Sequence, residues 1–301
     1  MSALDFVVSR TLPLIPRPLV HRVSRRYIAG DALDDAVGVV RSLNGRGLLA
    51  TLDVLGESVT SPGPVEGAVR EYLAALERIR GERLQCNISV KPTQLGLKID
   101  AALCGASLRR LAQAAHRQEN FVRIDMEDSS CTTATLDQHA TLRAEGFSNV
   151  GVVLQAYLRR SLRDVRALPA GANVRLCKGI YVEPRAIAYR DRAIVNRNFV
   201  RLLEELLERG AYVGIATHDE ELVWEAERIL DRRGLRPEEY EFQMLLGVDE
   251  ELRDLVHRGG HRLRIYVPYG ANWYAYSLRR LKENPRLAGY VMKSLWGRRR
   301  A

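Results

Sequence analysis

The chain has 301 residues, of which 46% are hydrophobic and 28% are charged, and this composition excludes a disordered or collagen-like chain. Its 46 lysines and arginines outnumber the 37 acidic residues, giving a formal charge of +9. That excess indicates an anionic partner, such as nucleic acid, lipid headgroups or a phosphorylated cofactor, unless the arginines only solvate long helices.

The cysteines and the apolar runs indicate a cytoplasmic protein. Four scattered cysteines without a CxxC pair predict neither a disulfide framework nor a thiolate zinc site. Charged residues interrupt the first apolar stretch, so no signal peptide is expected. The longest uncharged apolar run is about half of the ~20 residues that a spanning helix needs, so any membrane contact is expected to be peripheral. Aromatic residues do not interleave with a basic stripe, and nucleic-acid binding is not expected.

The first 45 residues predict a helical arm that Pro13, Pro16 and Pro18 interrupt. After the arm, eight β-rich runs alternate with longer amphipathic stretches. The clearest helical stretch covers residues 185–209 and carries one apolar stripe. The β-rich runs are residues 47–55, 86–90, 121–126, 150–157, 173–177, 212–217, 240–245 and 262–267.

Eight such units in about 250 residues predict a (β/α)8 barrel over residues 46–301, because short connections through helices imply parallel strands. Glycines support the count, since one falls between a helix and the next strand in most units, where a left-handed helix cap belongs. These glycines are Gly81, Gly146, Gly171, Gly210, Gly234 and Gly259. A doubly wound dinucleotide-binding sheet is the alternative, but no GxGxxG motif follows the first strand.

Polar side chains occur at nearly every predicted strand end, where a barrel carries its chemistry. Unpaired polar groups there cost several kcal/mol, so such a ring implies mutual pairing, a ligand, or both. The ring comprises Asp53, Lys91, Asp125, Glu127, Asp128, Gln155, Arg175, Lys178, Thr217, His218, Asp219 and Tyr266.

The last predicted helix adds two adjacent arginines. Tyr276, Arg279, Arg280 and Glu283 are spaced to share one helix face. A pair of guanidinium groups beside a tyrosine suits a carboxylate, although a solvated basic face has the same spacing. No metal site is expected, because His218 has no second histidine nearby in the sequence.

Eight segments, taken in order, resemble the motifs of the proline dehydrogenase family in its short monofunctional bacterial form. They are LNGRGLLATLDVLGE, NISVKPTQLGL, FVRIDMEDS, VGVVLQAYL, VRLCKGIYVEP, IATHD, YEFQMLLG and RIYVPYGANWYAYSLRRLKENP. The resemblance implies a distorted barrel that binds FAD non-covalently, with the eighth helix over the barrel mouth. It also implies oxidation of L-proline to Δ1-pyrroline-5-carboxylate, the first step of proline degradation to glutamate, with electrons passed to a membrane quinone and a pyrroline-5-carboxylate dehydrogenase as partner.

The resemblance also assigns site residues, motif by motif. Asp125 and Arg175 match the active-site aspartate and the arginine beside the flavin. The substrate-binding positions are Lys91, Tyr181, Leu245, Tyr266, Arg279, Arg280 and Glu283. The flavin-contacting positions are Met126, Gln155, Lys178, Gly179, Ile180, Thr217 and His218. Ile180 is bulkier than the alanine expected there, and Cys177 stands where valine or leucine is expected.

The chemistry of proline oxidation is consistent with this set, because cations can fix a carboxylate and disfavour the ammonium form of the amine. Asp125 could orient a cation or accept a proton, and the sequence leaves both roles open. Three other functions remain: a 4-hydroxyproline dehydrogenase, a barrel lyase or hydrolase that uses Lys91 as a Schiff base, and a basic module that binds nucleic acid or lipid.

Overall fold

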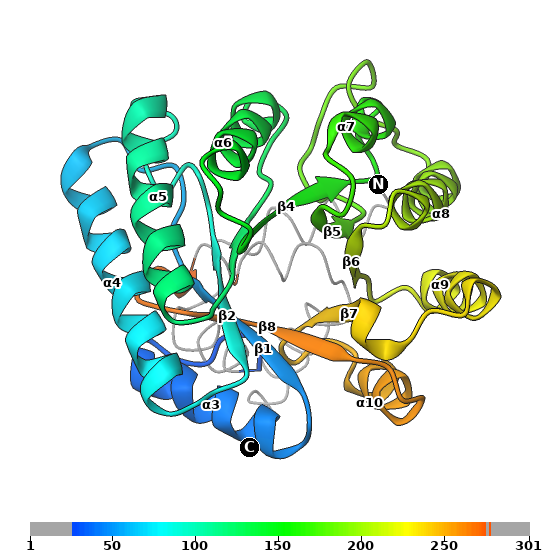
Figure 1. Ribbon diagram of the computed structural model, residues 1–301, viewed down its shortest axis with the longest axis horizontal. Coiled ribbons are helices and arrows are strands. Elements are labelled where there is room, and N and C mark those ends of the chain that lie inside the picture. Colours follow the sequence, from blue (N-terminus) through cyan, green and yellow to red (C-terminus); the bar gives the residue numbers. More distant parts are fainter. Residues whose placement is uncertain (1–25, 275–276, 278–301) are drawn as a thin grey trace, which may run out of the picture.

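The computed structural model describes residues 26–274 and residue 277, which form a closed barrel of eight parallel strands surrounded by helices (Figure 1). Each strand pairs with the next one along the chain, and β8 pairs with β1. The predicted barrel is confirmed, and all eight β-rich runs contain a strand. The strands are β1 (Leu49–Val54), β2 (Cys86–Val90), β3 (Val122–Ile124), β4 (Val150–Gln155), β5 (Asn173–Cys177), β6 (Tyr212–Ala216), β7 (Tyr240–Leu245) and β8 (Leu263–Tyr269).

Seven helices follow the first seven strands and cover the outside of the barrel (Figure 1). Because the strands are enclosed by helices outside and by side chains inside, β4 and β6 are nearly continuous apolar runs, whereas polar residues alternate with apolar ones in β5, β7 and β8. The helices are α4 (Pro62–Gly81), α5 (Ala101–Arg117), α6 (Thr132–Ala144), α7 (Ser161–Ala167), α8 (Arg192–Glu208), α9 (Glu220–Arg233) and α10 (Glu250–Arg258).

One more helix, α3 (Leu33–Gly45), precedes β1 and packs against both β1 and β8. Its buried face consists of Ala36, Val37, Val40 and Leu43. The end of the predicted arm therefore covers the seam where the first and last strands meet. Residues 1–25 of that arm lie outside the described residues, and so do Arg279, Arg280 and Glu283.

The helix predicted from residue 185 begins only at Arg192. Asp191 caps it, because the side chain accepts a hydrogen bond of 3.1 Å from the backbone of Ile194. The preceding residues pair with the chain after β4 instead: the Tyr189 amide donates to the Tyr157 carbonyl at 2.8 Å. The predicted apolar stripe of α8 is buried as expected: Val195, Phe199, Leu202, Leu203 and Leu206.

The glycine caps are confirmed in part. Gly146, Gly171, Gly210 and Gly234 have positive φ angles. The prediction is wrong for the other two, because Gly81 ends α4 without a positive φ and Gly259 has φ −66°. Within the described residues, no helix is both long and apolar enough to cross a bilayer.

Candidate active site

A cavity of about 490 Å³ opens at the carboxyl ends of the strands. Its walls contain every predicted site residue that the structure describes, which confirms that these strand ends converge. These residues are Lys91, Asp125, Met126, Gln155, Arg175, Lys178, Gly179, Ile180, Tyr181, Thr217, His218, Leu245 and Tyr266. The volume lies within the ~300–1,000 Å³ typical of ligand sites.

Asp125 is the centre of the polar network in this cavity. One of its carboxylate oxygens accepts hydrogen bonds from Ser89 Oγ at 2.7 Å and from Arg175 Nη1 at 2.6 Å. The other accepts the Tyr266 hydroxyl at 2.9 Å. Asp125 follows β3, and residues of β2, β5 and β8 therefore hold its carboxylate in one position. The predicted ring of polar residues is thus paired within itself and also faces a cavity.

Lys91 lies beside this network and pairs with the fully buried Asp53. Burial by itself lowers the pKa of Lys91, but the carboxylates of Asp53 and Asp125 outweigh that effect and raise the pKa above its usual value. Lys91 is therefore protonated at neutral pH and supplies a fixed positive charge next to the cavity.

Arg175 is held from two further sides. Its Nε donates to the side-chain oxygen of Gln243 on β7, and its guanidinium carbon lies 5.3 Å from the centroid of the Tyr266 ring. A guanidinium with an aromatic face beside it and a carboxylate at its end has little freedom to rotate. The positive charge of Arg175 therefore stays at the cavity floor.

A second group of cations lies where β5, β6 and α8 meet. Lys178 Nζ and Arg192 Nη2 both contact Asp219 Oδ2, at 2.6 Å and 2.8 Å. Burial alone would raise the pKa of Asp219, but hydrogen bonds from these two cations lower it to about 2. Two cations thus share one carboxylate at the cavity edge, which leaves capacity for a further anion.

Two neutral side chains complete the wall with oriented polar atoms. The Gln155 amide group donates to the carbonyls of Met126 and Glu127, at 3.1 Å and 2.9 Å. Its own side-chain oxygen has no hydrogen-bond partner among the described residues. His218 Nε2 accepts the Leu245 amide at 2.9 Å, so this nitrogen carries no proton.

Gly179 is required by the close approach of the chain to Tyr157. Its φ is 100°, and an added Cβ would lie 2.1 Å from a ring carbon of Tyr157. The left-handed backbone alone costs a non-glycine residue about 1–2 kcal/mol. We expect Gly179→Ala to lose more than that in free energy of unfolding, measured by urea denaturation.

A matched control for Gly179→Ala is Gly146→Ala. Gly146 has a similar φ of 94°, but nothing lies within 4 Å of its added Cβ. This variant should lose only the backbone contribution. Equal losses in the two variants would show that the contact with Tyr157 is unimportant.

Several lining residues were not predicted as site residues. Gln243 and Glu241 alternate with apolar residues in β7, and this alternation was the one signal that Gln243 faces the barrel interior. Arg192 belongs to a helix instead of a strand end, so no strand-end argument identifies it. The others are Val153, Cys177, Ala216 and Met244, whereas Glu127 and Asp219 were expected in the polar ring of strand ends but were assigned no role.

Comparisons with known proteins identify the family of this chain. A family model described as "Proline dehydrogenase" matches residues 36–292. A proline dehydrogenase from Deinococcus radiodurans is 34% identical over 297 residues, which cover 94% of this chain and 96% of that protein. Proline dehydrogenase 1 of Bacillus subtilis (strain 168) is 35% identical over 273 residues, or 90% of each chain.

Among solved structures, proline utilization A (PutA) from Bdellovibrio bacteriovorus, inactivated by N-propargylglycine, is similar with a TM-score of 0.82 and 26% identity. The match covers 88% of this chain. It covers 33% of the PutA chain, so this chain corresponds to about a third of that protein.

Proposed function

The chain belongs to the proline dehydrogenase family, and from this we propose that it binds FAD, oxidises L-proline to Δ1-pyrroline-5-carboxylate and passes the electrons to a membrane quinone. The observation that carries the proposal is the convergence of all thirteen described site residues on one cavity. The product would go on to a pyrroline-5-carboxylate dehydrogenase.

The donor set of the cavity fits a flavin dinucleotide. Lys178 and Arg192 share one carboxylate at the edge, where a diphosphate would add the missing negative charge. The unpartnered Gln155 oxygen can accept a hydrogen bond from a ring N–H. We propose that these residues, together with Met126, Gly179, Ile180, Thr217 and His218, hold the cofactor.

Lys91 and the segment after β8 would bind the substrate. Lys91 is protonated and faces the cavity, so it can pair with the proline carboxylate. The helix α3 covers the seam between β8 and β1. We propose that the segment after β8 lies over the cavity mouth and brings Arg279 and Arg280 to the same carboxylate, with Glu283 orienting them.

The other residues prepare the amine and the reacting carbon. Tyr181, Leu245 and Tyr266 would enclose the apolar ring and exclude water. Cations close to the ring nitrogen lower the pKa of the substrate ammonium and favour the neutral amine. A bound flavin would accept the hydride from the substrate carbon. Arg175 places a positive charge at the cavity floor, and the 2.6 Å ion pair with this arginine favours Asp125 as an orienting group.

The lyase alternative is disfavoured by the electrostatics of Lys91. A lysine that forms a Schiff base must lose its proton, which requires a lowered pKa. Lys91 instead has a raised pKa and is paired with Asp53. Borohydride trapping of substrate on Lys91 would reverse this conclusion.

The purified protein is expected to be yellow, and anaerobic L-proline should bleach its visible absorbance. Acid denaturation should release the flavin, because no attachment motif is present in the sequence. The measurement is an absorbance spectrum before and after proline, repeated with 4-hydroxyproline to distinguish the two substrates. A colourless protein that cannot be reconstituted with FAD would contradict the proposal.

The net charge of +9 predicts weak, salt-sensitive binding to anionic vesicles, where electrons would reach a quinone. Each basic residue near an anionic surface contributes about 1 kcal/mol, and salt screens that attraction. Deleting residues 298–301, which include three arginines, should weaken binding in a sedimentation assay without changing turnover with a soluble dye. Equal binding to neutral and anionic vesicles would exclude this electrostatic contact.

A further inference from the structure

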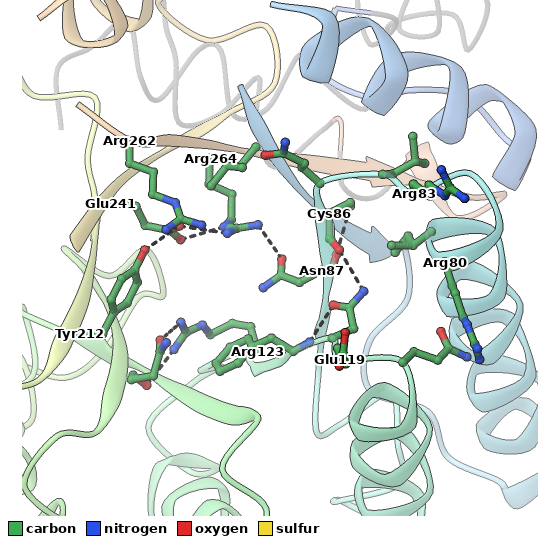
Figure 2. A pocket seen from close by; sticks show the side chains of 18 residues that line it. Arg80, Arg83, Cys86, Asn87, Glu119, Arg123, Tyr212, Glu241, Arg262 and Arg264 are labelled. Carbon is green, nitrogen blue, oxygen red and sulfur yellow. Dashed lines mark hydrogen bonds and ion pairs between the residues drawn. The ribbon is translucent and has the colours of Figure 1, made fainter. Parts of the chain in front are cut away.

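A second cavity, of about 610 Å³, lies at the opposite end of the barrel, where the strands begin. Its walls include the start of β1, β2, β5, β6, β7 and β8 and the loops that follow α4 and α5. Arg262 and Arg264 lie on one side of this space and Arg80 and Arg83 on the other, with Arg123 between them (Figure 2). None of these residues has a role in the proposed oxidation.

Arg123 is a buried cation without a carboxylate partner among the described residues. It is 2% exposed, and its guanidinium donates to the carbonyls of Val152 and Asn173 and to the Asn173 side chain. Its Nε makes no hydrogen bond within the described part of the chain. Burial, followed by the charge of Arg175, lowers its pKa to about 9, which still leaves it charged at neutral pH.

The remaining charges of this cavity do not neutralise Arg123. Glu241 is committed to Arg264, with contacts of 2.8 Å and 3.0 Å, and also accepts Tyr212 at 3.1 Å. In the described residues, Arg80, Arg83 and Arg262 form no ion pair with a carboxylate. The cavity is therefore lined by five arginines against two glutamates, Glu119 and Glu241, an excess of three positive charges.

Two charged residues at the rim have an unusual backbone. Arg83 and Glu119 follow α4 and α5 with φ angles of 53° and 52°, whereas the loops after α6, α8 and α9 place a glycine in this conformation. A left-handed residue that is not glycine costs about 1–2 kcal/mol. Both exposed side chains line the cavity, so each can be removed without disturbing the buried floor.

We propose that this lower cavity binds a small anion with two or more negative charges, carried by phosphate or by clustered carboxylates. Arginine forks bind both groups bidentately, and a buried guanidinium gains most from such a partner because it is shielded from water. The Asn87 and Tyr212 side chains at the floor add polar contacts, and Phe121 adds an apolar wall that suits an organic anion.

The test compares Arg83→Gly with Glu119→Gly. Both substitutions relieve the same left-handed backbone, but the first removes a positive charge and the second a negative one. With pyrophosphate as probe, in isothermal titration at constant ionic strength, we expect roughly three- to tenfold weaker binding for Arg83→Gly and tighter binding for Glu119→Gly. Citrate, titrated in parallel, distinguishes clustered carboxylates from phosphate.

Two controls distinguish anion binding in this lower cavity from anion binding in the upper cavity, which is the active-site cavity at the carboxyl ends of the strands. Arg192→Gln removes an exposed cation that we propose binds the diphosphate of the cofactor, and it should leave pyrophosphate affinity unchanged if the anion binds in the lower cavity. Proline oxidation by Arg83→Gly should match the parent enzyme, which shows that the barrel is intact. Failure of the parent to bind either anion, or the same change of affinity in both glycine variants, would overturn the proposal, and neither result bears on proline oxidation.

Discussion

Replacing Lys91 with methionine is expected to raise the KM for proline about tenfold to a hundredfold and to lower the free energy of unfolding by about 3–5 kcal/mol. The kinetic effect follows from the loss of the charged partner that we propose for the substrate carboxylate. The stability effect follows because burial already raises the pKa of Asp53, and without Lys91 this carboxyl must either stay charged and unpaired or take up a proton. Steady-state kinetics and urea denaturation measure the two effects.

The double variant Lys91→Met with Asp53→Asn separates these contributions. Removing both charges of a buried pair costs little, and the asparagine oxygen can still accept the 3.4 Å hydrogen bond from Tyr72. Stability should return towards that of the parent while the KM stays high. Recovery of both properties would show that Lys91 acts on the substrate only through the fold.

Arg279→Met and Arg280→Met are each expected to raise the KM for proline by roughly tenfold to a hundredfold, with little change in stability. A charged carboxylate that loses a bidentate, desolvated partner loses about 1.5–3 kcal/mol of binding. Arg279→Lys should recover part of the affinity, because lysine keeps the charge but not the fork. The measurement is the KM together with the affinity for carboxylate analogues.

Lys282→Met is the matched control for these two variants, since it removes a neighbouring charge that the family motif does not assign to the substrate. Its KM should equal that of the parent. Unchanged substrate binding in all three variants would show that the two arginines belong to a solvated helix face.

The barrel and most of its upper cavity were predictable because strand ends follow directly from the hydrophobic pattern. In a parallel barrel all carboxyl ends lie on one side, so Lys91, Asp125 and Arg175 had to converge. Which atoms pair could not be predicted, since Asp53 and Lys91 are 38 residues apart and their contact depends on side-chain rotamers. Gln243 was missed for a related reason: the alternation of polar residues in β7 does not reveal which side chain each of them contacts.

The lower cavity could not be predicted from the sequence, for another reason. Arg123 sits within an apolar strand, and a single arginine there predicts neither burial nor a cavity. The residue at which α8 begins could not be predicted either. The apolar stripe identifies the helix, but the hydrogen bond between the Tyr189 amide and the Tyr157 carbonyl determines where the helix begins. Contacts of this kind connect distant segments and leave no local pattern.

The packing of α3 over the seam between β1 and β8 has a consequence for chains that have been cut near the C-terminus. Every strand and every covering helix from α3 to α10 ends by residue 269, before the two arginines that we propose bind the substrate. A chain cleaved by a protease after residue 269 therefore keeps every element that closes the barrel. Such a chain would be a folded protein with weak affinity for proline, so in this architecture substrate affinity can be lost while the fold is kept.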